Sequence, residues 1–344
     1  MLVLPTSGRR SSTRDVPQVG ALRATSRLVA CLAAVSRKML VLLTCIALAV
    51  AFGVTVVAYR SAARAGRDAL DRLPIGTDGI IIGAQPIELR RNADDPAVLL
   101  LHGGGDTPQT LRYLAAFLHE RGYAVRVPLL PGHGRTVHAF ARADADEWLA
   151  AARAQLRDLE ERHPWVGLAG LSMGGALAAQ IAAATPTLPA LGLLAPYLAM
   201  PRSVVLAATL APLWGVAVPY VRALDPNGPR SIYDPQEAAR NLAYGVFTPA
   251  ALRALRLTVT RAFAALPAIA SPTLMIQSRE DNRIRPADGE RAFERIGAQE
   301  KQLVWVEGAG HVITVDYGRE RTFELLTGWF DAHRTAAASH TRRA

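Results

Sequence analysis

Apolar and polar positions alternate along most of this 344-residue chain with two different periods. From residue 75 onward, short apolar runs alternate with longer segments whose apolar residues recur three and four positions apart. Short apolar runs bounded by glycine or proline are typical of buried strands, whereas the longer spacing is typical of amphipathic helices. This pattern predicts an α/β fold in which a mostly parallel sheet carries helices on both faces.

The predicted strands and helices follow one another over residues 75–332, which we expect to form one domain. A helix is predicted to begin near Thr107-Pro108, because proline is tolerated in the first turn of a helix. The last helix is predicted over residues 316–333, with Asp316 as its N-cap. Another helix is expected over residues 145–162, and strands at residues 80–82, 87–89, 97–101, 124–127, 165–169, 190–194, 273–277 and 302–306.

A long insertion, residues 196–266, separates two of the predicted strands. Its stretch from Ser203 to Val221 carries no charge, which raises the alternative of a membrane span. Pro212 and Pro219 interrupt that stretch, and a span there would pull neighbouring strands of one sheet apart. We therefore interpret the insertion as an apolar lid over a binding pocket.

An apolar segment precedes the predicted domain. Residues 39–59 contain no charged side chain, and Arg37-Lys38 and Arg60 flank them. As a helix, such a segment spans about 30 Å, the hydrocarbon thickness of a bilayer. We predict a single transmembrane anchor; the alternatives are a secretory signal cleaved near Ala63-Arg64-Ala65, and a buried core helix.

The orientation of this anchor is nearly balanced under the positive-inside rule, because four basic residues lie within twenty positions on each side. The more distant Arg9, Arg10 and Arg14 favour a cytoplasmic N-terminus, with the folded domain outside the cytoplasm. If the signal were cleaved instead, the domain would be secreted.

The net charge of +10 is concentrated at the two ends of the chain. Residues 1–74 hold eleven basic and three acidic side chains, and residues 333–344 hold three basic and none acidic. Residues 75–332 are almost neutral, with twenty-five basic and twenty-six acidic side chains, and show no basic stripe with interleaved aromatics. This distribution argues against nucleic-acid binding. We expect residues 1–38 to be an unstructured basic tail and residues 333–344 to be a second basic tail.

The strongest chemical signal is the pattern Gly170-x-Ser172-x-Gly174 between a predicted strand and a predicted helix. A sharp turn there exposes the serine hydroxyl above the sheet, and the glycines allow strand and helix to approach closely. The alternative is a packing turn of small residues. Because the flanking strand and helix are those that the mechanism needs, we interpret Ser172 as a nucleophile.

A serine nucleophile needs a histidine that accepts its proton. His311 follows a predicted strand and precedes the last helix, and it is our candidate among the eight histidines. His102 and His133 lie in glycine-rich loops, where we expect them to hold loop structure. An ordinary loop histidine is the alternative reading of His311.

A carboxylate must orient that histidine and stabilise its charged form. Asp281 lies just past the predicted strand 273–277, and its neighbour Glu280 is the rival. The order Ser172, Asp281, His311 is the order of the α/β-hydrolases rather than that of the other two serine-protease arrangements.

Backbone N–H groups must bind the oxyanion that forms when an ester carbonyl is attacked. The N–H of Met173, directly after the nucleophile, is the first expected donor. The second is expected from the loop after strand 97–101, where we choose Gly104; the adjacent Gly103 and Gly105 remain alternatives.

Taken together, these motifs make residues 75–332 resemble the α/β-hydrolases. The likeness is greatest to the bacterial carboxylesterase and monoacylglycerol-lipase group, whose domain is of the serine aminopeptidase S33 type. In that family the serine, aspartate and histidine form a catalytic triad, which the resemblance transfers to Ser172, Asp281 and His311. The position after His-Gly, often bulky in related esterases, is Gly104 here, which widens the expected acyl site. The motifs that carry the likeness are Leu99–Gly104, Leu129–Gly134, Gly170–Gly175, Gln277–Asn282 and Gly310-His311.

The resemblance implies a serine hydrolase that cleaves carboxylic esters, and the apolar insertion favours a small ester or a monoacyl lipid as substrate. One alternative is an aminopeptidase that binds an α-ammonium through acids of the insertion, Glu237 with Asp225 and Asp234. A thioesterase and an inactive membrane-tethered scaffold are the others. No cofactor or metal is expected, since no His-x-x-x-His pair or carboxylate cluster appears. The sequence makes no prediction of oligomeric state.

Overall fold

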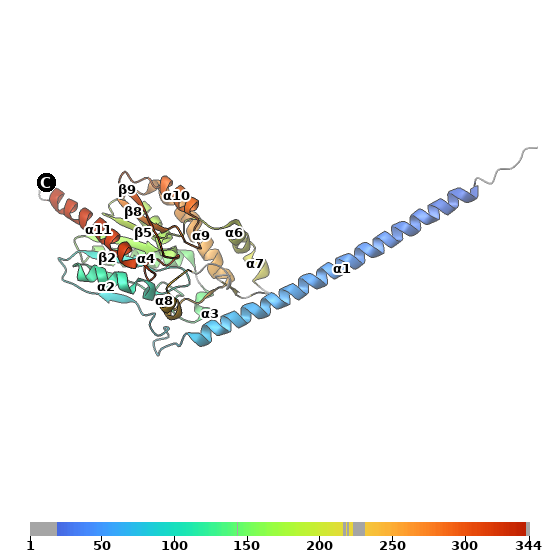
Figure 1. The fold of residues 1–344 in the computed structure, drawn as a ribbon, viewed down its shortest axis with the longest axis horizontal. Coiled ribbons are helices and arrows are strands. Elements are labelled where there is room, and N and C mark those ends of the chain that lie inside the picture. The colour runs from blue at the N-terminus through green and yellow to red at the C-terminus, as the bar shows by residue number, and fades with distance from the viewer. Residues whose placement is uncertain (1–18, 143, 216–217, 219, 223–230, 342–344) are drawn as a thin grey trace, which may run out of the picture. The chain divides into compact units, whose positions relative to one another are not determined.

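The computed structural model of the chain describes residues 19–142, 144–215, 218, 220–222 and 231–341. The chain divides into two compact units, Met1–Val57 and Ala58–Ala344. The second unit has the predicted architecture of a mostly parallel sheet between two layers of helices (Figure 1).

Within the described residues, the main sheet of the second unit has seven strands in the order β1-β3-β2-β4-β5-β8-β9. Strand β1 pairs antiparallel with β3, and the other neighbouring strands are parallel. Because parallel strands end at the same edge, the loops after them meet there. The strands are β1 (Ile87–Leu89), β2 (Ala97–Leu101), β3 (Ala124–Val127), β4 (Val166–Leu171), β5 (Leu191–Leu194), β8 (Thr273–Ser278) and β9 (Lys301–Val306).

The strand predicted at residues 80–82 does not form, and this prediction was wrong. Ile81 makes one isolated bridge with Ile75, and its N–H donates to the carbonyl of Gly134 instead of to a strand. Gly79 and Gly83 on either side have φ angles of 71° and 92°, which end any extended backbone there.

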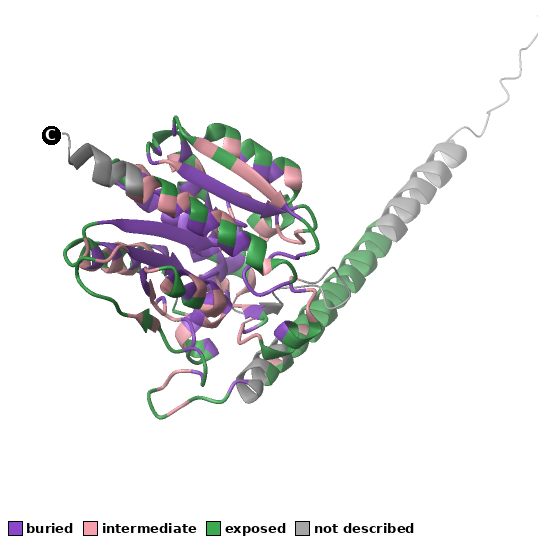
Figure 2. Ribbon diagram, turned by 60° about the vertical axis from the view of Figure 1, so that its left-hand side comes forward, coloured by how far each residue is buried: buried purple, intermediate pink, exposed green. Residues whose placement is uncertain are grey.

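Alternating side chains of the central strands pack against helices on opposite faces of the sheet. Leu99 and Leu101 of β2 belong to one buried cluster, with residues of α4, α5, α9 and α10. Val98 and Leu100 belong to the other, with residues of α2 and α11. The strands are therefore buried on both faces, as Figure 2 shows. The helices are α2 (Arg112–Glu120), α4 (Ala145–Glu160), α5 (Met173–Ala184), α9 (Pro249–Ala265), α10 (Pro286–Arg295) and α11 (Arg319–Thr341), with short helical segments η1 (Pro108–Leu111), α3 (Val137–Phe140) and η2 (Leu266–Ala268).

The insertion forms several short elements and one long helix. The apolar stretch weighed as a second membrane span is broken, since α6 ends at Thr209 and α7 has only four residues, Ala211–Trp214. The long helix α9 is held on α5 by a hydrogen bond from the Gln180 side chain to the carbonyl of Thr258. Among the described residues, the insertion contains α6 (Arg202–Thr209), α7 (Ala211–Trp214), β6 (Val221–Arg222), α8 (Pro235–Arg240), β7 (Val246–Phe247) and all of α9.

Helix α1 (Val19–Arg72) contains the predicted anchor. In the part of the chain that the structure describes, it is the one helix long and apolar enough to cross a bilayer, over Arg37–Ser61, and its most apolar stretch has a mean hydropathy of 2.8. The prediction of an unstructured tail over residues 1–38 was wrong from Val19 onward, because alanine, leucine and arginine favour helix and extend the apolar helix backwards. Residues 1–18 lie outside the described part. Likewise α11 continues past the predicted end at residue 333 to Thr341.

Asp316 does not cap the last helix, which begins at Arg319. Its carboxylate is fully buried and accepts hydrogen bonds of 2.7–3.0 Å from four backbone N–H groups. Two of these belong to the insertion, one to the loop of His311 and one to the residue after Asp316. This carboxylate therefore joins the insertion to the loop that carries His311; the four donors are Tyr233, Asp234, Gly310 and Tyr317.

Candidate active site

Ser172 lies at a sharp turn between β4 and α5. Its backbone has φ 55° and ψ −117°, a strained combination for a residue with a side chain. The turn needs glycine on both sides, because a Cβ on Gly170 would lie 2.2 Å from the carbonyl oxygen of Gly174. A Cβ on Gly174 would lie 2.1 Å from the carbonyl oxygen of Leu101. The close approach of β4, α5 and β2 thus holds the serine in its strained conformation.

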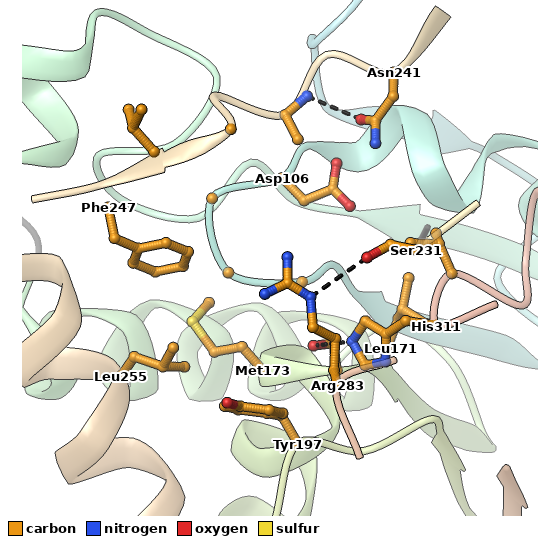
Figure 3. A pocket seen from close by; sticks show the side chains of 18 residues that line it. Asp106, Leu171, Met173, Tyr197, Ser231, Asn241, Phe247, Leu255, Arg283 and His311 are labelled. Carbon is orange, nitrogen blue, oxygen red and sulfur yellow. Dashed lines mark hydrogen bonds between the residues drawn. The ribbon is translucent and has the colours of Figure 1, made fainter. Parts of the chain in front are cut away.

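His311 reaches the same point from the loop after β9. Its Nε2 lies 2.8 Å from Ser172 Oγ, although the two residues are 139 positions apart in the sequence. Figure 3 shows the imidazole at the wall of a pocket, with its side chain only 8% exposed. With Nδ1 protonated, Nε2 is an acceptor that faces the serine hydroxyl.

Asp281 follows β8 and holds the other side of the imidazole. Its Oδ2 lies 2.8 Å from His311 Nδ1 and accepts a second hydrogen bond of 2.8 Å from the Gln277 side chain. Its Oδ1 accepts the N–H groups of Arg283 and Ile284 at 2.7 and 3.0 Å. Burial alone would raise the pKa of this carboxyl, but the imidazole and the two N–H groups outweigh burial and hold the pKa below its ordinary value. The group is therefore ionised where it faces His311.

The neighbouring carboxylate, Glu280, points elsewhere. Its side chain is exposed, and its Oε1 accepts the N–H of Gly308 at 3.2 Å. Of the two acids that the sequence left open, the structure brings Asp281 to the imidazole.

The glycine-rich loop after β2 runs past Ser172. A Cβ on Gly103 would lie 3.4 Å from Ser172 Cβ, and one on Gly104 would lie 3.1 Å from Met173 Sδ. Among the described residues, the N–H groups of Gly103, Gly104 and Gly105 have no hydrogen-bond acceptor. Backbone donors without partners therefore lie beside the serine.

Two other histidines hold loops near the site. His102 Nε2 accepts the N–H of Leu130 at 3.1 Å, and His133 Nδ1 lies 3.0 Å from the carbonyl of Pro131. Burial lowers the pKa of His102 to about 4 and that of His133 to about 3, so both rings are neutral. Their rings lie 5.0 Å apart and hold two neighbouring loops, as the sequence suggested.

The pocket has an apolar side and a polar side (Figure 3). Phe247 and Leu255 of the insertion line the apolar side together with Met173. Four polar side chains that sequence reasoning missed line the other side: Asp106, Ser231, Asn241 and Arg283. Asp106 follows the glycine-rich loop and Arg283 follows the motif that contains Asp281, so their sequence positions could have identified them. Ser231 and Asn241 reach the pocket only through the fold of the insertion.

Asp106 is a buried acid in the pocket wall, 7% exposed. Its Oδ1 accepts the N–H of Thr107 at 2.9 Å, and its Oδ2 lies 3.8 Å from the Cβ position of Gly103. Burial raises the pKa of Asp106 to about 7, against the opposing effect of the Thr107 N–H. The group therefore changes charge near neutral pH, beside the glycine-rich loop.

No cluster of three or more histidine, cysteine or acidic side chains suited to a metal ion occurs in the described residues.

Comparison with known proteins identifies the family to which this chain is similar. The family described as serine aminopeptidase, S33, matches residues 92–317. A thermostable monoacylglycerol lipase of Bacillus sp. (strain H-257) is 29% identical over 254 residues, covering 74% of this chain and 97% of the relative. A carboxylesterase of Bacillus subtilis (strain 168) is 27% identical over 228 residues, covering 66% of this chain and 88% of the relative.

A solved structure of a lipolytic enzyme is also similar to this chain. A structure described with LipS and LipT, two metagenome-derived lipolytic enzymes, is 31% identical, with a TM-score of 0.67, and covers 74% of this chain and 100% of its own. The family match spans more than half of the chain, and the structural match has the same fold. The chain therefore belongs to the serine aminopeptidase S33 family of α/β-hydrolases, and it is lipase- and esterase-like within that fold.

Proposed function

We propose that this chain hydrolyses carboxylic esters by two-step acyl transfer, with Ser172 as nucleophile, His311 as general base and Asp281 as its partner. The observation that carries the proposal is the continuous hydrogen-bonded chain from Asp281 through His311 to Ser172, with both contacts at 2.8 Å. This arrangement supplies a nucleophile, a base and an orienting carboxylate, as serine acyl transfer requires.

In the first step Ser172 Oγ attacks the ester carbonyl while its proton moves to His311 Nε2. The carbonyl oxygen becomes an oxyanion, and the N–H groups of Met173 and Gly104 donate to it. Support for Gly104 comes from its position against Met173 and from its N–H having no acceptor among the described residues. His311 then gives its proton to the leaving alcohol, which leaves an acyl-serine.

In the second step a water molecule attacks the acyl-serine, and His311 takes its proton. The tetrahedral intermediate collapses, His311 returns that proton to Ser172, and the carboxylic acid departs. Asp281 stabilises the positive imidazole in both steps, which suits a carboxylate whose pKa lies below its ordinary value.

The proposed substrate class is an ester with an apolar acyl chain, including monoacyl lipids. Phe247, Leu255 and Val246 bring apolar surface of the insertion to the nucleophile. The relatives include proteins named monoacylglycerol lipase and carboxylesterase, which supports this class.

The aminopeptidase alternative has less support from the geometry. It needs a free acid in the insertion for an α-ammonium group, but the Glu237 carboxylate is bound by Arg112 and by the Tyr113 hydroxyl. The Asp234 carboxylate caps α8 through the N–H groups of Gln236 and Glu237. Asp225 lies outside the described residues.

We also propose that α1 anchors the enzyme in a membrane through Arg37–Ser61, with the hydrolase domain outside the cytoplasm. The segment is long and apolar enough to cross a bilayer, which supports the anchor. Its apolar side chains are also not buried against the rest of the protein, so a membrane could cover them. A membrane-anchored enzyme would meet lipid esters where they are concentrated.

Replacing Ser172 by alanine should lower kcat/KM for nitrophenyl esters by about 10⁴-fold or more and abolish covalent labelling by a fluorophosphonate, because no nucleophile remains. Ser203→Ala, at an exposed serine on α6, is the matched control and should keep both properties. An unlabelled wild-type protein would point to an inactive scaffold, and a labelled, active Ser172→Ala protein would contradict the assignment.

The acyl-chain preference should depend on the apolar wall. For nitrophenyl esters, kcat/KM should rise from acetate to octanoate, since each buried methylene contributes about 0.8 kcal/mol. Phe247→Ala should reduce the octanoate-to-acetate ratio, whereas Leu213→Ala, at a side chain 76% exposed on α7, should leave it unchanged. A maximum at acetate in the wild type would refute a lipid-like substrate.

Ionisation of Asp106 should oppose the oxyanion, because its carboxylate lies beside the glycine-rich loop. With a pKa of about 7, this acid is mostly neutral at pH 6 and mostly charged at pH 8. The ratio of kcat/KM for Asp106→Asn to that of the wild type should therefore increase about tenfold between these two pH values. A ratio that stays constant from pH 6 to pH 8 would show that Asp106 does not act on the reaction through its charge.

The anchor should resist extraction by alkaline carbonate, because a spanning helix is held by the hydrophobic effect. The full-length chain should stay in the membrane pellet, and a Leu48→Arg, Val54→Arg variant should be released. Recovery of a soluble chain that begins just after Ala65 would establish a cleaved secretory signal instead.

A further inference from the structure

Arg283 brings a positive charge into the pocket beside the proposed catalytic residues. Its backbone N–H donates to Asp281 Oδ1, so the residue is fixed two positions after the carboxylate that orients His311. Its partly buried side chain lines the same pocket as Ser172 and His311. Figure 3 shows the guanidinium reaching into the pocket between Asp106 and Tyr197.

The insertion sets the direction of this guanidinium. Arg283 Nε donates to Ser231 Oγ at 3.3 Å, and Ser231 Oγ donates to Asn282 Oδ1 at 3.1 Å. A guanidinium has five N–H donors in a fixed plane, so it can keep protein partners and still bind a ligand oxygen. The planar guanidinium therefore lies where a ligand in the pocket would contact it.

The polar side of the pocket lies on the loops that flank His311. Ser231 is joined to the His311 loop, because its carbonyl accepts the N–H of Val312 at 3.0 Å. Arg283 lies on the loop of Asp281, the partner of His311. In the proposed mechanism His311 gives its proton to the leaving alcohol, so the alcohol part of the ester lies on this side, opposite Phe247 and Leu255.

The guanidinium lies in a poorly solvated place and near one described carboxylate. Burial lowers the pKa of Arg283, against the opposing effects of Tyr197 and of the Asp281 carboxylate, which faces His311. A cation in such a place gains more from an anionic ligand than one in water, and a guanidinium binds carboxylate and phosphate through paired hydrogen bonds. Among the described residues that line the pocket, the acid is Asp106, which is mostly neutral below pH 7 and then does not repel an anion.

We propose that the pocket takes esters whose alcohol part carries an anionic group, a carboxylate or a phosphate, bound by Arg283 on the leaving-group side of His311. The proposal rests on the ester hydrolysis proposed above and narrows its substrate class to anionic amphiphiles. The apolar side of the pocket holds the acyl chain, and Arg283 recognises the charge of the head group.

The test compares pairs of short, water-soluble esters that differ only in charge, with the full-length protein in a non-ionic detergent at pH 6. One pair is butanoyl glycolate and butanoyl glycolamide; the other is 2-butanoyloxyethyl phosphate and its dimethyl ester. The wild type should prefer the anionic member of at least one pair by about tenfold or more in kcat/KM, as expected for a charge-assisted hydrogen bond. The pair that shows the preference identifies the anion as carboxylate or phosphate.

Arg283→Gln should abolish this preference, and Arg283→Lys, which keeps the charge but not the paired donors, should retain part of it. A structural role alone would lower kcat/KM for both members of a pair by the same factor and leave their ratio unchanged, which would overturn the proposal. A wild type that favours the neutral members would overturn it without any variant. A wild type that hydrolyses neither member of either pair, and that no fluorophosphonate labels, would contradict the proposed ester hydrolysis itself.

Discussion

The position of the His311 ring is the constraint on which the site depends. The imidazole must lie within hydrogen-bonding distance of two groups that come from distant parts of the sequence, Ser172 and Asp281. The parallel sheet makes this possible, because β4, β8 and β9 end at one edge and each is followed by a loop with one of the three residues. The order of the strands therefore determines the site as much as the side chains do.

Two buried carboxylates attach the insertion to the rest of the domain. Asp316 joins the start of α8 to the loop of His311 through backbone N–H groups, and Glu237 of α8 binds Arg112 and Tyr113 of α2. Removing one partner of such a buried group leaves the others unsatisfied, which makes these attachments costly to break. The insertion thus lines the pocket with fixed residues, including Phe247 and Ser231, as well as covering it.

Local patterns predicted most of the fold and part of the site. The apolar runs located the parallel strands to within about two residues, and the glycines around Ser172 located the turn whose close contacts exclude a Cβ. The errors arose where the apolar pattern alone does not determine secondary structure. Ile80–Ile82 is apolar but lies between two glycines of positive φ, so it forms no strand. Helix α1 begins at Val19, within the segment expected to be unstructured. Ser231 and Asn241 were missed because they reach the pocket only when the insertion folds, whereas Asp106 and Arg283 adjoin motifs that the sequence did reveal.

The most direct test of the central claim is to locate the covalent adduct. Wild-type protein treated with a fluorophosphonate should be digested, and the modified serine identified by mass spectrometry of the peptides. The pocket holds a second serine, Ser231, so reactivity in the pocket alone does not identify the nucleophile. An adduct on Ser172 alone is the predicted result, and an adduct on Ser231 or another serine, with Ser172 unmodified, would contradict the account.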